Sequence, residues 1–201
     1  MRITVLLISA LIVSFIGKQH PDFFQKLVRE AVEQTKQKVK YDPAYVKITY
    51  PGGDVPANTG VCTDLVIRAY RGMGIDLQKE VHVDMLKHFK DYPQLWKLKK
   101  TDANIDHRRV PNLMTYFDNM GAKLKISMDA ADYQPGDLVT WNLENKKIMS
   151  GITHIGIVTD EKTNDGKRCL IVHNIGNGNV IEDVLFSYVI IGHYRFKKTR
   201  V

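Results

Sequence analysis

The chain is poor in cysteine, with only Cys62 and Cys169 among 201 residues. Two cysteines exclude a small fold held together by a disulfide framework, and they leave either one disulfide or two free thiols. Low-complexity tracts and internal repeats are also missing, which argues against disordered and repeat architectures. Hydrophobic residues make up 44% and charged residues 25%, an ordinary balance for a globular domain with a buried core.

Long apolar runs are missing except at the N-terminus, where positions 3–16 are apolar apart from Thr4 and two serines. Arg2 precedes this run and polar residues follow it, which is the layout of a secretory signal peptide. The run is shorter than the roughly 20 residues that a transmembrane helix needs. No clean small-x-small cleavage triplet ends it. We therefore expect residues 1–17 to be a signal peptide or an uncleaved anchor, with export to the periplasm or beyond and possible membrane association through residues 3–16.

A strong excess of one charge sign is absent, because the formal net charge is +7 and the basic residues occur in scattered pairs such as Arg108-Arg109 and Lys146-Lys147. No basic stripe interleaved with aromatic residues stands out, so a nucleic-acid partner is not expected. A mildly basic exported protein would instead be attracted to an anionic envelope polymer or lipid surface. The alternative for any single pair is an ordinary solvated face. We expect a monomer.

Helical and strand-like patterns occupy different halves of the chain. Apolar residues at helical spacing predict helices over 22–40, 62–71, 81–89 and 110–119. Short β-branched and aromatic runs predict strands over 138–141, 152–159, 169–173, 180–185 and 188–196. Helices first and strands later predict an α+β class, with the helices packed on a small antiparallel sheet. We expect a single domain over residues 18–201.

Cys62 stands at the predicted start of a helix, after a glycine-rich loop. The N-terminus of a helix carries partial positive charge and free N–H groups, which would stabilise a thiolate and help to hold an oxyanion. Cys62 is therefore a candidate nucleophile, and a buried structural cysteine is the alternative. Cys169 is expected to lie too far away for a disulfide with Cys62.

Two histidines are placed to meet across one hairpin. His154 opens the strand over 152–159, and His173 ends the strand over 169–173. The turn signal Asn164-Asp165-Gly166 makes these strands antiparallel neighbours, so the start of one lies beside the end of the other. This arrangement fits a general base, His154, and a residue that orients it, His173. Two histidines with purely structural roles at the sheet end are the alternative.

A dense polar cluster over residues 106–109 precedes the helix predicted from position 110. Asp106 and Arg109 in this cluster could recognise a substrate carboxylate, and a capped, solvated helix start is the alternative. The histidines at positions 82 and 88 match no common metal spacing. We expect no metal and no cofactor.

Several motifs together resemble the NlpC-type branch of the papain-like cysteine peptidases, which are best known as bacterial cell-wall hydrolases. The order and spacing match over roughly residues 41 to 196. The segments that carry the resemblance are Tyr50-Pro51-Gly52-Gly53, Val61-Cys62-Thr63-Asp64, Pro135-Gly136-Asp137-Leu138-Val139, His154-Ile155-Gly156-Ile157 and Val172-His173-Asn174.

Within that group the chain looks most like an exported bacterial family labelled domain of unknown function 1287. The segments concerned are Tyr50–Asp54, Gly60–Asp64, Asn104–Arg109 and His173–Gly176. The chain departs from the wider group at Val61, where an aspartate is usual, and at Thr63-Asp64, which replace Ser-Gly. The stretch over residues 81–125 is also long for the group. The resemblance therefore extends to the catalytic core and not to the substrate pocket.

The resemblance implies an exported cysteine hydrolase that cleaves amide or isopeptide bonds of cell-wall peptides, with peptidoglycan as its partner. The implied catalytic residues are Cys62, His154 and His173. The implied substrate-binding residues are Tyr50, Asp64, Asp106, Arg109 and Asn174, with the Tyr50 hydroxyl as a helper for the oxyanion and Asn174 as a second choice for the orienting role. An acyltransferase or thioesterase with the same thiol, or an inactive cell-wall-binding module, are the alternatives.

Overall fold

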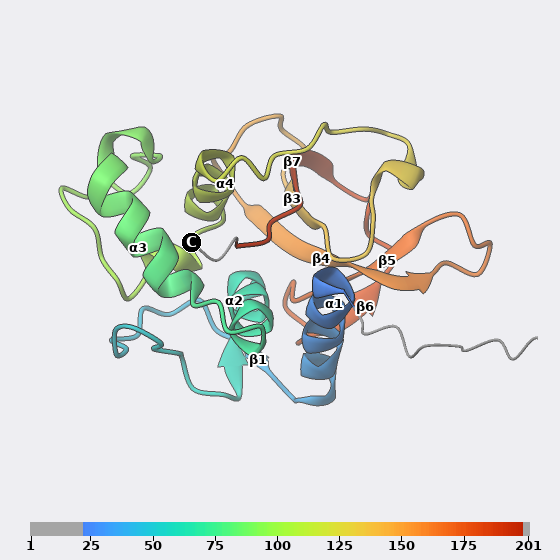
Figure 1. Cartoon of the computed structure of the whole chain (residues 1–201), viewed down its shortest axis with the longest axis horizontal. Coiled ribbons are helices and arrows are strands. Elements are labelled where there is room, and N and C mark those ends of the chain that lie inside the picture. Colours follow the sequence, from blue (N-terminus) through green and yellow to red (C-terminus); the bar gives the residue numbers. More distant parts are fainter. Residues whose placement is uncertain (1–21, 199–201) are drawn as a thin grey trace, which may run out of the picture.

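In the computed structural model, which describes residues 22–198, helices occupy the first part of the chain and most strands the second (Figure 1). The helices are α1 (Phe23–Glu33), α2 (Cys62–Gly72), α3 (Leu77–His88) and α4 (Val110–Asn119). Short 3-10 helices cover Gln34–Lys36, Phe89–Asp91, Asp106–Arg108 and Ala130–Asp132. The strands are β1 (Lys40–Tyr41), β2 (Thr59–Gly60), β3 (Leu138–Asn142), β4 (Thr153–Lys162), β5 (Cys169–His173), β6 (Val180–Glu182) and β7 (Val189–Tyr194).

The expected leader over residues 1–17 lies outside the described residues. None of the helices within residues 22–198 combines the length and the apolar character that crossing a membrane requires.

Helix α1 begins as predicted but ends earlier. The Asp22 carboxylate accepts a hydrogen bond from the Gln25 N–H (2.8 Å), and the Gln25 side chain accepts one from the Asp22 N–H (3.1 Å), which closes a capping box. The helix expected over 22–40 is too long. After a 3-10 turn the chain becomes extended, because Lys40 donates its N–H to the Asn58 carbonyl (2.8 Å) in the parallel pair of β1 and β2.

The other helices lie close to their predicted bounds. Helix α4 covers the predicted 110–119, and α2 extends one residue beyond its predicted end. Helix α3 begins at Leu77 rather than at position 81. The Asp76 carboxylate caps this earlier start by accepting a hydrogen bond from the Gln78 N–H (3.2 Å).

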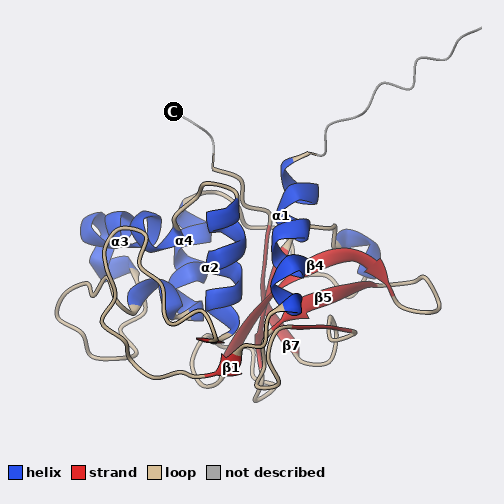
Figure 2. Cartoon of the chain, turned by 90° about the horizontal axis from the view of Figure 1, so that it is seen from below, coloured by secondary structure: helices blue, strands red, loops and turns tan. Residues whose placement is uncertain are grey.

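The main sheet has five strands in the order β6-β5-β4-β3-β7, and every neighbouring pair is antiparallel. Helices α1 and α2 lie side by side against strand β4 (Figure 2). The α+β class predicted from the sequence is therefore confirmed. The predicted hairpin around Asn164-Asp165-Gly166 connects β4 to β5, as expected.

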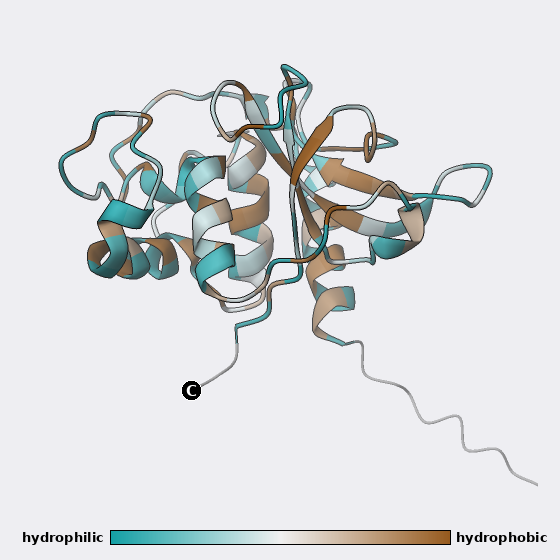
Figure 3. Cartoon of the chain, turned by 90° about the horizontal axis from the view of Figure 1, so that it is seen from above, coloured by the Kyte–Doolittle hydropathy of each residue, from teal (hydrophilic) through white to brown (hydrophobic). Residues whose placement is uncertain are grey.

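Both faces of the sheet are buried, and each face has its own core. The larger core lies on the helix side and includes Cys62, Leu65 and Ile157. The second core lies on the other face and includes Trp141, Val158 and Cys169. Neighbouring residues along a strand alternate between the two cores, and Figure 3 shows the hydrophobic residues concentrated in the strands and the helices beside them. Both thiols are free.

Candidate active site

Cys62 is the first residue of α2 and is buried. The backbone N–H groups of Ile155 and Thr63 lie near its sulfur and favour the thiolate. Ile155 follows His154 on β4, so the thiol lies beside the strand that carries the expected base. The sequence placed Cys62 at a helix start, and the structure adds that this start is held directly against the sheet.

The expected pair of histidines is in contact. His154 Nε2 lies 2.8 Å from His173 Nδ1, and His173 Nε2 lies 3.1 Å from a carboxylate oxygen of Glu182. Three side chains from β4, β5 and β6 therefore form one hydrogen-bonded row. Glu182 was not identified from the sequence, because it reaches His173 only through the pairing of β5 with β6.

The row determines which nitrogen of each imidazole carries hydrogen. An ionised carboxylate can only accept, so His173 Nε2 donates to Glu182 and His173 Nδ1 is left as an acceptor. His154 Nε2 then donates to that acceptor. The remaining nitrogen of His154, Nδ1, carries a lone pair and is the basic atom of the site.

Burial sets the resting protonation state of the thiol and the imidazole. Desolvation raises the pKa of Cys62 to about 12. Desolvation, reinforced by His173, lowers the pKa of His154 to about 3. Burial therefore disfavours the charged form of each of these two groups in the free protein. The lowered thiol pKa expected from the helix start is not found, because desolvation outweighs the N–H contacts.

A glycine on β4 leaves room for the orienting histidine. Gly156 is the register partner of His173. A Cβ atom at Gly156 would lie 2.6 Å from a methyl carbon of Ile171 and 3.2 Å from the Cβ of His173. Any larger residue would push β5 away, and with it the ring that contacts His154.

A hollow of about 250 Å³ opens beside Cys62. Its lining includes Tyr41, Trp96, Arg109 and Ile152. The Arg109 guanidinium lies 4.0 Å from the centre of the Trp96 ring and 3.6 Å from a carboxylate oxygen of Asp106. Arg109 thus presents a positive charge within the same hollow as the thiol, on an aromatic platform that limits its freedom.

Tyr50, expected beside the thiol, lies elsewhere. Its side chain is 43% exposed and packs against the ring of His82, with ring centres 4.8 Å apart. Tyr41 lines the hollow instead. Burial, and then the nearby Cys62, raise the pKa of the Tyr41 phenol, which keeps it a hydrogen-bond donor at neutral pH.

No local pattern around Tyr41 indicates that it belongs to the site. It reaches the site because β1 pairs in parallel with β2, which places Tyr41 opposite Gly60, two positions before Cys62. The intervening segment is a long loop whose path cannot be read from periodicity.

Asp64 is not placed to bind substrate. Both of its carboxylate oxygens accept from the guanidinium of buried Arg108, at 2.8 and 2.9 Å. One of them also accepts from the Val61 N–H (2.7 Å) at the first turn of α2. Arg108 further donates to the Ala44 carbonyl (3.1 Å), so this ion pair joins the start of α2 to two distant segments. The expected substrate contact is replaced by a role in positioning Cys62.

Asp106 and Arg109 are brought together, but only Arg109 lines the hollow. Asp106 is buried and its carboxylate accepts a hydrogen bond from the Asp102 N–H. Burial raises the pKa of Asp106 to about 6. This carboxylate is therefore a neighbour that orients Arg109 rather than a group exposed to substrate.

Asn174 follows His173 and is fully buried. Its side-chain oxygen accepts a hydrogen bond from the Gly176 N–H (3.2 Å), which shapes the turn after β5. The Nε2 atom of His154 is engaged by His173, so Asn174 does not take the orienting position.

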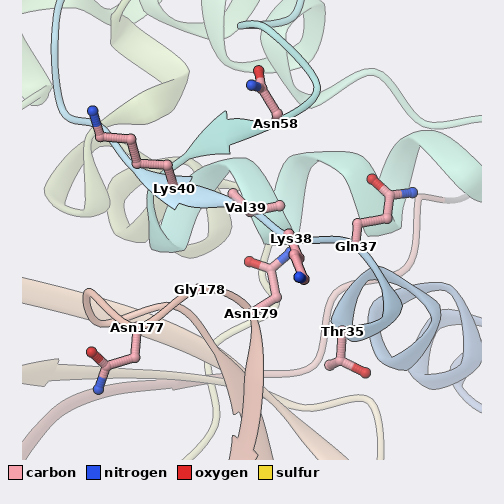
Figure 4. A pocket seen from close by; sticks show the side chains of 9 residues that line it. All are labelled: Thr35, Gln37, Lys38, Val39, Lys40, Asn58, Asn177, Gly178 and Asn179. Carbon is pink, nitrogen blue, oxygen red and sulfur yellow. The ribbon is translucent and has the colours of Figure 1, made fainter.

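A second hollow, of about 510 Å³, lies where the loop after His173 faces the end of α1 and the pair of β1 and β2 (Figure 4). Its lining is polar and includes Lys38, Lys40, Asn58 and Asn177. Both lysines come from the segment that leads directly to Tyr41. This second hollow therefore lies between the strand pair that precedes Cys62 and the turn that follows His173.

Comparisons with known proteins find a matching family model, a curated relative and a similar solved structure. The family model described as Domain of unknown function (DUF1287) matches residues 28–196. A curated relative, "Uncharacterized protein YijF" of Escherichia coli (strain K12), is 53% identical over 166 residues, which cover 83% of this chain and 78% of the relative. Among solved structures, NlpC1 from Trichomonas vaginalis is similar at a TM-score of 0.44 and 16% identity, over 89% of this chain and 46% of that one.

Proposed function

This chain belongs to the family described as Domain of unknown function (DUF1287), and from that premise we propose that it is a cysteine hydrolase acting on amide or isopeptide bonds. One observation carries the proposal: the row of His154, His173 and Glu182 leaves a basic nitrogen on His154, and the next residue on the strand, Ile155, has its N–H near the thiol of Cys62. A nucleophile, a base and an orienting group are the elements that covalent catalysis by a thiol requires.

In the proposed reaction, His154 Nδ1 takes the proton of Cys62 as the sulfur attacks the carbonyl carbon. The Cys62 N–H and the Tyr41 hydroxyl stabilise the oxygen that becomes negative. His154 then gives its proton to the leaving amine, and a thioester joins the acyl group to the sulfur. Water, activated by His154, attacks this thioester, releases the acid and restores the thiol.

His173 and Glu182 stabilise the charged imidazole during these steps. When His154 becomes an imidazolium, its Nε2–H continues to donate to His173 Nδ1, and Glu182 places a negative charge at the far end of the row. The protonated state is disfavoured by burial in the free protein. The row therefore offsets part of the cost of forming that charge in the transition state.

We propose a cell-wall peptide as the substrate. Arg109, held on Trp96 inside the hollow beside Cys62, is suited to a carboxylate of such a peptide. The positive net charge and the expected export favour an anionic polymer of the envelope. The polar hollow with Lys38 and Lys40 offers a second site for an anionic or amide-rich part of the same chain.

Digestion of purified peptidoglycan, followed by mass analysis of the released fragments, tests the proposal. The wild-type protein is expected to release fragments and Cys62→Ala to release none, a loss of several orders of magnitude in rate. Cys169→Ala is the matched control, because this second buried thiol lies in the core on the other face of the sheet. Release of the same fragments by Cys62→Ala would overturn the proposal.

The same proteins should also be assayed on acyl thioesters. Turnover of thioesters without turnover of cell-wall peptides would assign the thiol to an acyltransferase or thioesterase. Binding to cell wall without turnover of either substrate would assign the chain to a binding module.

A further inference from the structure

Six large apolar side chains are exposed on two loops next to one edge of the sheet. We call them the apolar ridge: Leu124, Ile126, Met128, Ile148, Met149 and Ile152. Met128 is 78% exposed and Ile152 is 59% exposed, so these side chains are not the margins of a buried core. An exposed cluster of this kind marks an interaction surface.

The two loops form one surface. Leu124 donates its N–H to the carbonyl of His193 on β7 (2.8 Å), which fixes the first loop along the sheet edge. Ile126, Ile148 and Met149 line a hollow of about 330 Å³, together with Ile190 and Ile191 of β7 and with Lys147. Three ridge residues from the two loops, Ile126, Ile148 and Met149, therefore share one apolar hollow with β7.

A buried amide holds the second loop in shape. The side-chain nitrogen of Asn142 donates to the carbonyls of Ile148 (3.0 Å) and Ser150 (2.9 Å). Its side-chain oxygen accepts from the N–H groups of Glu144 (2.9 Å) and Lys146 (3.2 Å). Four hydrogen bonds from one fully buried side chain thus direct Ile148 and Met149 outward.

Basic residues accompany the ridge. Lys123 and Lys125 alternate with Leu124 and Ile126 in the first loop, and Lys146-Lys147 directly precede Ile148 and Met149 in the second. Asp118 pairs with Lys123 (2.9 Å) and Glu144 with Lys146 (2.6 Å). Lys125 and Lys147 form no ion pair with any residue from 22 to 198. Two lysines are therefore available to an anionic partner beside the apolar side chains.

We propose that the apolar ridge docks on the surface of an anionic phospholipid membrane. Such a membrane accommodates both parts of the surface. The apolar side chains can enter the boundary between headgroups and acyl chains, and the lysines can contact the anionic headgroups. Pairing of two copies through the ridge would bring Lys125 and Lys147 of both copies together, which like-charge repulsion disfavours. The proposal does not depend on the hydrolase activity.

Docking would also orient the site. Ile152 belongs to the ridge and also lines the hollow beside Cys62. The membrane-bound face would then border the entrance to that hollow, and substrates near the lipid surface would reach Cys62 first.

A local fluorescence measurement tests the docking while the full chain, leader included, is present. An environment-sensitive fluorophore is attached to Ile148→Cys, in a background in which the native thiols are buried. The matched control carries the label at Lys167→Cys, an exposed position in the turn at the other end of β4. Vesicles of phosphatidylglycerol and phosphatidylcholine are added, with pure phosphatidylcholine vesicles as the neutral arm.

The expected result is a blue shift and a several-fold rise in emission at position 148 with anionic vesicles, weaker with neutral vesicles, and little change at position 167. No change in emission at position 148 would overturn the proposal. Equal changes at both positions would also overturn it, because they would indicate attachment through another part of the chain. A blue shift without vesicles that grows with protein concentration would also overturn it and assign the ridge to a second copy. In the unlabelled chain, Ile148→Asp with Met149→Asp should lower the bound fraction on anionic vesicles at an unchanged Tm.

Discussion

The Nε2 atom of His154 lies 2.8 Å from the Nδ1 atom of His173, and the far nitrogen of His173 contacts Glu182. This relationship makes the protonation pattern of the site depend on a carboxylate that does not touch the thiol. The basic nitrogen of His154 exists because the row ends in an acceptor.

Glu182→Gln should lower kcat about tenfold or more, with little effect on KM. An amide can present either an oxygen or an N–H to His173, so the tautomers of both histidines are no longer fixed. The dependence of kcat on pH should change on its acidic side in this variant. A merely structural role for Glu182 would leave that dependence unaltered. Glu161→Gln, on the exposed end of β4, is the control. Wild-type kinetics for Glu182→Gln would contradict the relay.

The two tyrosines should respond differently to loss of the hydroxyl. Tyr41→Phe is expected to lower kcat at least tenfold, because Tyr41 lines the hollow beside Cys62 and can donate to the developing oxyanion. Tyr50→Phe should leave kcat unchanged, since Tyr50 packs against His82 instead. Comparison of the two variants on one cell-wall peptide decides the assignment, and the reverse order of effects would restore Tyr50 as the helper.

Removal of one partner of the buried ion pair should destabilise the fold. Asp64→Ala leaves the Arg108 guanidinium buried without its partner, and a loss of about 3–5 kcal/mol in unfolding free energy is expected. Asp118→Ala removes an exposed pair with Lys123 and should cost less than about 1 kcal/mol. Chemical denaturation measures both, and similar costs for the two variants would refute the special role of Asp64.

Acid should destabilise the protein through its buried histidines. Burial lowers the pKa of His107 to about 4 and that of His154 to about 3, so the unfolded chain binds protons that the folded one does not. The stability they contribute is present above about pH 6.5 and is lost as pH falls toward 4, by up to about 1.4 kcal/mol per pH unit for each proton. Burial raises the pKa of Asp106 to about 6, so the folded chain binds this proton more readily than the unfolded chain. The contribution of Asp106 to stability therefore rises as pH falls.

His107→Gln tests this balance, because it removes the contribution of His107 and leaves those of His154 and His173 in place. Unfolding free energies measured from pH 7 to pH 5 should fall less steeply for the variant than for the wild type. Parallel curves would show that the ring of His107 takes up its proton equally in the folded and unfolded states.

The thiol should be slow to alkylate in the free protein. With a pKa raised to about 12 by burial, Cys62 is almost fully protonated at pH 7, so its rate with iodoacetamide should lie below that of free cysteine and rise steadily with pH. The Cys169→Ala background removes the other thiol. A rate plateau below pH 7 would show instead that a thiolate is paired with an imidazolium at rest.

The sequence was informative where local pattern determines position. Cys62 at a helix start follows from a glycine-rich loop and apolar spacing, and the meeting of His154 with His173 follows from one hairpin signal. Both depend on short-range rules of helix spacing and strand pairing. Only the start of α3 differs from its prediction, because the Asp76 cap allows the helix to begin at Leu77.

The errors concern contacts between distant segments. Asp64 forms a motif with Cys62, but its partner Arg108 lies 44 residues later, and nothing near Asp64 indicates an ion pair. Tyr41 reaches the thiol through a two-residue parallel strand that no periodicity can reveal. Glu182 reaches His173 through the third strand of a meander whose register the sequence leaves open.

The placement of the two cores on opposite faces of the sheet has a consequence for redox chemistry. Cys62 and Cys169 lie in different cores, separated by the hydrogen-bonded strands. In an oxidising compartment a disulfide between Cys62, the proposed nucleophile, and Cys169 could not form without breaking the sheet. Because the strands separate the two thiols, an oxidant of Cys62 has to come from solution, through the hollow that substrate would use.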